Sequence, residues 1–289
     1  MLGQTATGKS SIAVKLAKKF SGEIISADSR QIYKGLDIAT GKVTKKEMQD
    51  VPHHMLSVVS PKKVFSVAKW QEQTKKIIAE IHDHGKLPII CGGTGFYIKS
   101  IVENVVLPEV PPNKKLREKL KKKTAGELCE ILGKLDSEIL KTIDTKNPAR
   151  LVRAIEIATK LGLVPKLQKN KPDYEILQIG LKLPEKILRQ KIHDRVISRI
   201  KRGMFSEARK LNEKGLSLSR MRSLGLEYRL LADLLQKKIS PADFVRQLET
   251  ADWQYARRQW QWFKRNKKTK WFSPTNSKKI GKEVKKFLS

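Results

Sequence analysis

Gly3-Gln4-Thr5-Ala6-Thr7-Gly8-Lys9-Ser10 stands almost at the start of the chain and has the complete G-x-x-x-x-G-K-[ST] spacing of a phosphate-binding loop. In such a loop backbone N–H groups surround a phosphate, the lysine adds a mobile positive charge, and the serine hydroxyl can bind Mg²⁺. The loop normally connects a buried strand to a helix. It therefore predicts an α/β fold and a polyphosphate ligand, with Ser10 as the metal ligand.

Helices and strands alternate after this loop. The apolar spacing predicts them at Ser11–Phe20, Glu23–Ala27, Val67–His84 and Lys86–Cys91. This order is typical of a parallel sheet with helices on both faces, in which ligands bind beyond the carboxyl ends of the strands. The phosphate loop, Asp28 and Gly92–Gly95 all fall at that edge, so we expect the functional site there.

The chain changes character near the proline-rich segment Leu107–Pro112. Residues 113–172 are rich in lysine, have helical periodicity and carry no strand signal, whereas Tyr174–Leu183 returns to a strand pattern. From Pro184 we expect only helices to the end of the chain. We therefore predict a P-loop NTPase-like catalytic core from residues 1–112 and 173–289, with an all-helical insertion at 113–172.

The charge of the chain favours a polyanionic partner. Among 289 residues, Lys and Arg exceed Asp and Glu by 61 − 29, a net charge of +32. A generally lysine-rich proteome is the alternative explanation. Two cysteines, Cys91 and Cys129, cannot form a four-ligand zinc site and are expected to be ordinary thiols. No apolar run has the length of a membrane span and no signal peptide is recognisable, so we expect a cytoplasmic protein.

The segment Asp28–Lys42 has few aliphatic residues and many hydrogen-bonding groups. A purely structural loop does not need this density, so we interpret it as functional. Asp28 is the strand-end carboxylate nearest the phosphate loop, because the strand that ends at Cys91 continues into Gly92 and Gly93. We expect Asp28 either to hold a metal or to take part in the chemistry.

The motifs, taken together, resemble the bacterial tRNA isopentenyltransferase (tRNA dimethylallyltransferase) family. The pattern D-S-x-Q-x-Y-x-x-x-D-I-x-T-x-K at Asp28–Lys42 follows G-x-T-A-x-G-K-S and precedes Pro52-His53-His54 and G-G-T-G-x-Y at Gly92–Tyr97. The resemblance continues at Asn147–Glu156 and Tyr255–Lys264, so it covers nearly the whole chain in order. Gln4 replaces the family's usual proline, Leu226 follows Gly225 where a tyrosine is usual, and the zinc finger of eukaryotic relatives is missing.

The resemblance implies transfer of a dimethylallyl group from dimethylallyl diphosphate to the exocyclic amine of the tRNA adenosine 3′ to the anticodon. Asp28 would be the general base, while Lys9, the loop N–H groups and Mg²⁺ on Ser10 would stabilise the departing diphosphate. Thr94 would help to position the acceptor, and Arg195 would face the diphosphate. Arg199 and Arg202 lie further along the same predicted helix, and we expect them on a solvated face.

The acceptor adenine must leave the anticodon stack, so we expect base flipping into a channel. The residues expected to contact tRNA are Asp28, Ser29, Arg30, Gln31, Thr94, Arg117, Ala149, Arg150, Leu151, Val152, Arg153, Arg222, Gly225, Tyr228, Arg257, Arg258, Gln261 and Lys264. The stripe Trp253, Ala256, Trp260 and Phe263 is interpreted as core rather than as a stacking surface. His53 and His54 are expected to make loop hydrogen bonds rather than to bind a metal.

Other functions remain open at this point. A small-molecule P-loop kinase would account for the loop and Asp28 but not for the charge. An isopentenyltransferase for free adenine nucleotides would need no basic insertion, and a non-catalytic RNA-binding protein would not need Lys9, Ser10, Asp28 and Thr94. We expect a monomer. Because family members run several apolar residues into the loop, and only Met1 and Leu2 precede it here, we also expect the true start to lie upstream.

Overall fold

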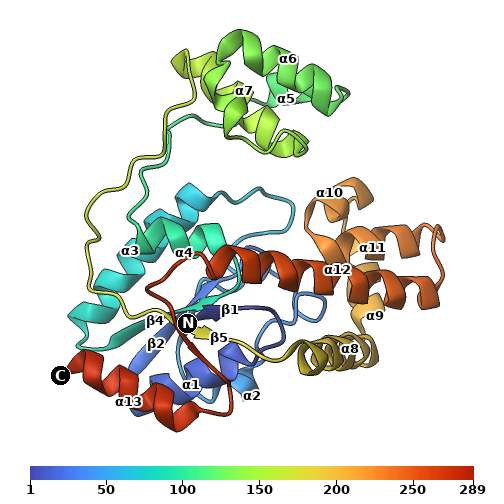
Figure 1. The fold of residues 1–289 in the computed structure, drawn as a ribbon. Coiled ribbons are helices and arrows are strands. Elements are labelled where there is room, and N and C mark those ends of the chain that lie inside the picture. Colours follow the sequence, from blue (N-terminus) through green and yellow to red (C-terminus); the bar gives the residue numbers. More distant parts are fainter. The chain divides into compact units, whose positions relative to one another are not determined.

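The computed structural model describes residues 1–289, which form two compact units (Figure 1). The first unit consists of Met1–Val102 and Pro172–Ser289, and the second of Glu103–Lys171. The second unit begins before Asn113, where the insertion was predicted to start. The reason is that its two connecting segments pair with each other: Val106 N donates to Gln168 O at 2.9 Å, and Val105 and Lys169 form an antiparallel bridge.

The strands of the first unit are all parallel to their partners. They are β1 (Leu2–Gly3), β2 (Gly22–Ala27), β3 (His53–His54), β4 (Leu87–Gly92), β5 (Ile179–Leu181) and β6 (Lys270–Phe272). They form two three-stranded sheets, β3-β2-β4 and β1-β5-β6. The sheets adjoin along β4 and β1, because the Met1 amine donates to Ile90 O at 2.8 Å and Gly92 N donates to Met1 O at 3.2 Å. The combined order is therefore β3-β2-β4-β1-β5-β6.

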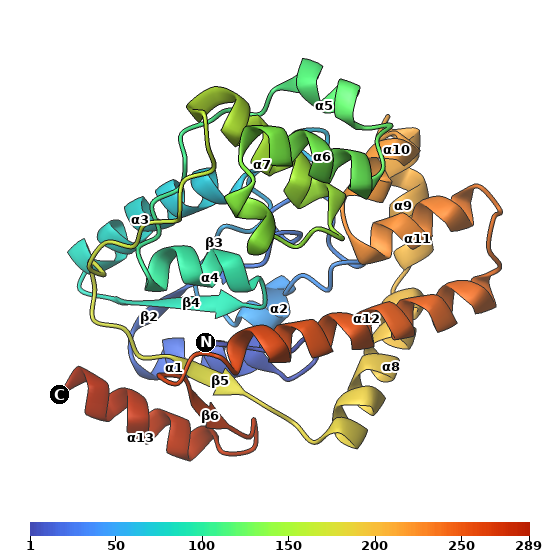
Figure 2. The same cartoon turned by 45° about the horizontal axis from the view of Figure 1, so that its top comes forward.

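Helices cover both faces of this sheet. Those of the first unit are α1 (Lys9–Lys19), α2 (Lys45–Met48), α3 (Val67–Asp83), α4 (Gly95–Val102), α8 (Glu185–Lys201), α9 (Met204–Glu213), α10 (Leu218–Ser223), α11 (Leu226–Leu235), α12 (Pro241–Phe263) and α13 (Ser277–Leu288). Figure 2 shows α1 and α13 on one side of the strands, and α3 and α4 on the other. None of the helices is long and apolar enough to span a membrane.

Strand alternation divides the core into these two layers. On β2, Ile24 packs with Ile89 and with apolar residues of α1 and α13, whereas the next residue, Ile25, packs with residues of α3, α4, α11 and α12. Both isoleucines are at most 3% exposed. The predicted α/β fold, a parallel sheet flanked by helices, is therefore confirmed.

The second unit is entirely helical apart from its bridge. It contains α5 (Lys114–Leu120), α6 (Ala125–Leu135), the 3-10 helix η1 (Glu138–Lys141) and α7 (Pro148–Leu161). Leu128, Leu132, Leu151 and Ile155 are nearly inaccessible and form its own small core. This separate core explains why residues 113–172 carry a helical period without any strand signal.

Two secondary-structure predictions were wrong. The strand expected over Tyr174–Leu183 is only Ile179–Leu181, because both of its partners are short: β1 offers Leu2 and Gly3, and β6 offers Lys270–Phe272. The chain is also not helical throughout after Pro184. Lys270–Phe272 forms β6 beside β5, a pairing that only the tertiary structure supplies.

Candidate active site

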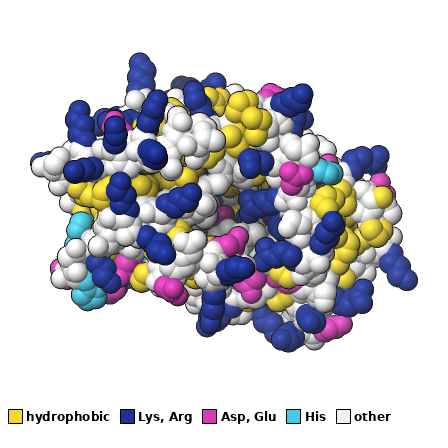
Figure 3. Space-filling model, turned by 90° about the horizontal axis from the view of Figure 1, so that it is seen from below, with side chains coloured by type: hydrophobic (Ala, Val, Ile, Leu, Met, Phe, Trp, Pro, Cys, Tyr) yellow, Lys and Arg dark blue, Asp and Glu magenta, His cyan; other side chains and the backbone are white.

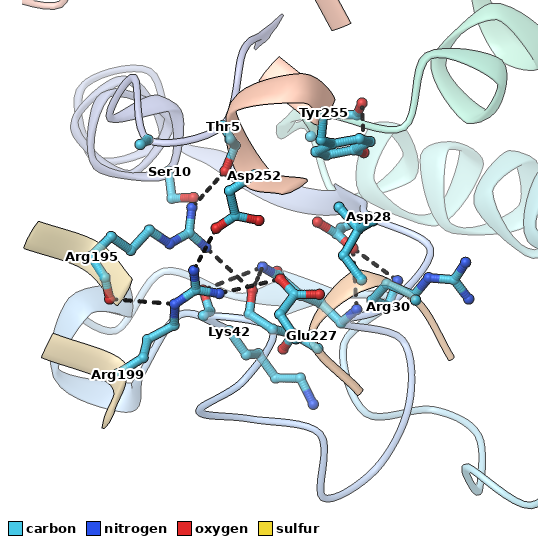
Figure 4. Close-up of a pocket in the computed structure, with 18 of the residues that line it drawn as sticks. Thr5, Ser10, Asp28, Arg30, Lys42, Arg195, Arg199, Glu227, Asp252 and Tyr255 are labelled. Atoms are coloured by element: carbon cyan, nitrogen blue, oxygen red, sulfur yellow. Dashed lines mark hydrogen bonds and ion pairs between the residues drawn. The ribbon is translucent and has the colours of Figure 1, made fainter. Parts of the chain in front are cut away.

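A cavity of about 950 Å³ opens at the carboxyl ends of the strands in the first unit. Its wall is formed by the phosphate loop, by the segments that follow β2 and β4, and by residues of α8, α11 and α12. This is the edge of a parallel sheet at which ligands are expected. Asp28 and the phosphate loop therefore face the same hollow (Figure 4).

The phosphate loop is held by its own side chains. Lys9 Nζ donates to Gln4 O at 2.6 Å, and Thr7 Oγ1 donates to the same oxygen at 2.8 Å. Gly8, at φ +82°, leads into α1, so the first N–H groups of that helix point to the cavity. Burial, with a smaller contribution from the nearby Arg195, lowers the pKa of Lys9 to about 8, while Cys91 and Asp28 oppose the shift. An anion at the loop would restore the charge of this lysine.

Arg195 lies beside the loop, as the resemblance implied. Its Nη1 donates to Thr5 Oγ1 at 2.8 Å and its Nη2 to Thr40 O at 3.2 Å. Gly41 makes room for it, since a Cβ there would lie 2.2 Å from Nη2. Burial lowers the pKa of Arg195, with a further contribution from Arg199. The two anchored N–H groups fix the guanidinium next to the phosphate-binding loop.

Arg199 was expected on a solvated face, and that expectation was wrong. Its side chain is 3% exposed and donates to Asp252 Oδ2 at 2.8 Å, Glu227 Oε1 at 3.2 Å and Ala39 O at 2.6 Å (Figure 4). Burial raises the pKa of Glu227, with a further contribution from Asp252. The two carboxylates come from α11 and α12, far from α8 in sequence, so no local pattern could reveal the cluster. Arg202, by contrast, is exposed at the cavity rim.

Asp28 and Thr94 lie at the ends of neighbouring strands. Asp28 Oδ1 accepts hydrogen bonds from Arg30 N at 2.8 Å and Gln31 N at 3.3 Å, and Oδ2 is left without a partner. Thr94 Oγ1 accepts from Ser29 N at 3.1 Å, which ties the turn after β4 to the segment after β2. Asp28, Ser29, Arg30 and Gln31 line the cavity, whereas Thr94 stands behind Ser29. A turn held in this way presents one carboxylate oxygen to a ligand.

The start of α11 completes the wall. Gly225 has φ +125°, and a Cβ there would lie 2.9 Å from Arg30 Nε, so this glycine admits the arginine. Arg222 lines the cavity and is paired with Asp233 at 2.6 Å. Tyr228 is fully buried and its hydroxyl donates to Glu207 at 2.7 Å. The prediction that Tyr228 contacts tRNA is therefore wrong.

Several residues that were expected to contact tRNA have structural partners inside the second unit. Glu156 has a fully buried side chain that accepts from Arg117 Nε at 2.6 Å, Arg153 Nη1 at 3.2 Å and Asn113 N at 2.8 Å. Leu151 is 0% exposed, which contradicts a direct tRNA contact. Ala149 and Arg150 are exposed, and Val152 is half-buried. The two arginines thus serve the packing of α5 against α7.

Helix α12 presents two distinct faces. Ala256 and Phe263 are buried, and Trp253 and Trp260 are half-buried, so the interpretation of this stripe as core is confirmed. The exposed residues on the other side include Arg257, Arg258, Gln261 and Lys264. Sequence reasoning missed Tyr255 and Gln259, which line the cavity from the same helix. Their only sequence signal is their place within the motif Tyr255–Lys264.

The histidine pair makes hydrogen bonds, as predicted. His53 Nδ1 contacts Val51 O at 2.8 Å, and His54 Nε2 contacts Glu23 Oε2 at 2.6 Å. No group of three or more His, Cys, Asp or Glu side chains that could hold a metal ion occurs in the structure. Cys91 and Cys129 are free thiols.

Positive charge is widely spread over the surface. On the face shown in Figure 3, lysine and arginine side chains dominate the charged groups and surround a central hollow. The order of the parallel strands, the phosphate loop and the basic cavity at their carboxyl ends define a P-loop α/β protein whose cavity suits a phosphorylated ligand beside a carboxylate.

Known proteins narrow this class. The model of the IPP transferase family matches residues 31–266. The tRNA dimethylallyltransferase 2 of Treponema denticola is 44% identical over 93% of this chain and 91% of its own. The solved tRNA isopentenylpyrophosphate transferase of Bacillus halodurans is similar with a TM-score of 0.74 and 30% identity, over 98% of this chain and 93% of that one. A eukaryotic dimethylallyltransferase acting on tRNA has a TM-score of 0.73 and 26% identity, over 90% of this chain and 68% of that one.

This chain belongs to the IPP transferase family, and it is a transferase. The resemblance read from the motifs is thereby confirmed. The alternative of a small-molecule kinase loses its support, because the matching region includes the basic second unit and the exposed face of α12.

Proposed function

We propose that the protein transfers a dimethylallyl group from dimethylallyl diphosphate to the exocyclic amine of the tRNA adenosine 3′ to the anticodon. The observation that carries the proposal is the common cavity of Lys9, Arg195 and Asp28. Two cations beside a phosphate loop suit a diphosphate leaving group, and a carboxylate across the same hollow suits proton removal from the acceptor.

The chemistry follows from this arrangement. The amine nitrogen attacks C1 of the dimethylallyl group, the bond from C1 to the diphosphate oxygen breaks, and its electron pair leaves with the diphosphate. Lys9 and Arg195 stabilise the charge that develops on that oxygen. Asp28 accepts the proton that the nitrogen loses, through the oxygen that has no partner. General-base assistance of this kind contributes about 10²–10⁴-fold to the rate.

The residues of the loop fit a bound Mg²⁺. Ser10 is exposed to the cavity, and its hydroxyl makes no hydrogen bond within the protein. A site with few protein oxygens suits this ion, which usually keeps several waters and binds through substrate phosphates. When bound, Mg²⁺ would supply further positive charge to the diphosphate. Ser10 would hold it, and Lys9 and Arg195 would share the remaining charge.

The acceptor nucleotide is proposed to enter from the side of Arg30 and Gly225. Ser29, Arg30, Gln31 and Arg222 line the cavity and could contact the flipped base and its neighbours. The exposed face of α12, with Arg257, Arg258, Gln261 and Lys264, would bind the RNA backbone. Ala149, Arg150, Val152 and the partly exposed Arg117 and Arg153 are the proposed contacts of the second unit. The phosphate loop, Arg195 and Asp28 already line one cavity of a single chain, so we propose a monomer as the active form.

The test uses labelled dimethylallyl diphosphate, Mg²⁺ and an anticodon stem-loop with adenosines at the last anticodon position and the next one. We expect label on the second adenosine, and none when that adenosine is replaced by guanosine. Free adenosine monophosphate in place of the RNA tests the related transferase for free nucleotides. If the RNA takes up no label and the protein hydrolyses ATP instead, the proposal is refuted and a nucleotide-hydrolysing enzyme is favoured.

A further inference from the structure

We propose that Gln259 is a positioning residue that fixes the distance between the two reacting groups. This inference rests on the proposed function, in which the phosphate loop holds the donor and the turn after β4 helps to hold the acceptor. One side-chain amide joins them: Gln259 Oε1 accepts from Thr5 N at 2.7 Å, and Nε2 donates to Gly93 O at 2.9 Å. The residue is 5% exposed.

The joined segments are those that carry the chemistry. Thr5 belongs to the phosphate loop and also accepts a hydrogen bond from Arg195. Gly93 directly precedes Thr94, whose hydroxyl holds Ser29 beside Asp28. The amide of Gln259 is therefore linked on one side to the diphosphate site and on the other to the proposed base. It needs both of its polar atoms for these links, so neither link can be lost without leaving a buried polar atom without a partner.

The surroundings show that α12 is built to approach this turn closely. A Cβ on Gly93 would lie 2.2 Å from Gln259 Nε2, and a Cβ on Gly95 would lie 2.3 Å from Trp262 Nε1. Tyr255, one turn earlier on the helix, donates its hydroxyl to Gly93 O at 3.4 Å. Only glycine at position 93 leaves room for the amide, so the contact is a close fit of helix against turn.

A second bond fixes the helix to the loop. Gln4 Nε2 donates to Ala256 O at 3.2 Å, and Gln4 is 8% exposed. Its own carbonyl oxygen receives Lys9 Nζ, so this residue links the catalytic lysine to α12. The family's usual proline could not donate such a bond. Helix α12 is thus attached to loop and turn by its buried face while its exposed face carries the proposed RNA contacts.

The expected effect of breaking the link is a loss of rate rather than of binding. Donor and acceptor react when their atoms are held within about 3–3.5 Å, and a misplacement of about 1 Å can cost about 10²-fold. We expect Gln259→Met, which keeps the volume but removes both hydrogen bonds, to lower the single-turnover transfer rate about 10–100-fold at saturating substrates. Inorganic diphosphate and the anticodon stem-loop should bind within about threefold of wild type.

Two further variants separate positioning from simple packing. Gln259→Glu keeps an oxygen that can accept from Thr5 N, but it replaces the NH2 donor to Gly93 O by a second oxygen. Two oxygens then repel each other, so this variant should also slow transfer. Gln254→Met removes an exposed amide from the same helix and should leave the rate unchanged. The melting temperature of each variant shows whether the fold survives.

A double-mutant cycle gives the decisive measurement. If Gln259 acts by placing the turn, Thr94→Val should slow transfer less in the Gln259→Met background than in wild type. Additive effects of the two substitutions on the transfer rate would overturn the proposal. A wild-type rate for Gln259→Met would also overturn it, and so would a loss of diphosphate or stem-loop binding that accounts for the whole loss of rate. If the wild-type protein itself transfers nothing, the proposed function fails first, and this outcome is distinguishable from the others.

Discussion

Raising the pH from 7 to 9 should weaken donor binding, because Lys9 loses its proton in that interval. Burial lowers the pKa of Lys9 to about 8 in the free protein, whereas a bound diphosphate would keep the lysine charged. Below this pKa the charged lysine is already present. Above it, binding must first take up a proton, so the affinity falls as the pH rises.

The magnitude follows from the pKa of the free protein. With a value of about 8, Lys9 is mostly charged at pH 7 and only about one-tenth charged at pH 9. The dissociation constant should therefore rise about tenfold over these two pH units, or about 1.4 kcal/mol. Burial raises the pKa of the Cys91 thiol and of the Tyr255 hydroxyl, which keeps their contribution small over this range. A terminal phosphate, with a pKa near about 6, is almost fully ionised throughout.

The assay is isothermal titration of the protein with dimethylallyl thiodiphosphate at constant ionic strength, in buffers of different ionisation heat. These buffers report the proton uptake directly. Lys9→Arg is the matched control, because its guanidinium stays charged and the buried amine of Met1, whose pKa burial also lowers, is unchanged. A flat pH response of the wild type, or an equal slope in Lys9→Arg, would refute the assignment of this proton to Lys9.

The other predictions concern the base, the second unit and the RNA surface. Asp28→Asn should lower transfer about 10²–10⁴-fold while stem-loop affinity, measured by filter binding, stays within about threefold; joint loss of both would show a structural role. Glu156→Gln should destabilise the second unit, because it removes the buried negative charge that pairs with Arg117. The expected loss is on the order of 2 kcal/mol, less than for a fully buried pair, because Arg117 is partly exposed. Hydrogen exchange at α7 measures this, and unchanged protection would contradict it. Arg258→Gln or Lys264→Gln should each reduce the slope of log affinity against log salt by about 0.7–0.9, and equal slopes would remove that residue from the RNA surface.

Local patterns were sufficient for the central part of the fold. The phosphate loop, β2, α3 and β4 could be predicted because each depends on apolar spacing and turn residues within a few positions of one another. The end of α3 is an example: the helix stops at Asp83, before the turn at Gly85, which has φ +67°. The placement of Asp28 beside the loop followed from the rule for parallel sheets, without any knowledge of the other contacts.

Long-range pairings were beyond the reach of the sequence. The three residues of β6 lie in a lysine-rich stretch and become a strand only because β5 offers them a parallel edge. In the sequence Arg199 looks like a solvated arginine, but in the structure it is buried and paired with Asp252 and Glu227. Tyr228 lies in a segment that was expected to contact RNA, yet its hydroxyl donates a hydrogen bond to Glu207 inside the core.

The sequence by itself therefore determined the phosphate loop, the parallel α/β core and the family, and it predicted roles for Lys9, Asp28 and Arg195. Only the tertiary structure decided which charged residues are buried in pairs, and that Gln259 joins the loop to the turn that carries Thr94. The physical reason is that a motif is encoded by neighbours in the chain, whereas a buried polar atom needs a partner that folding brings from far away.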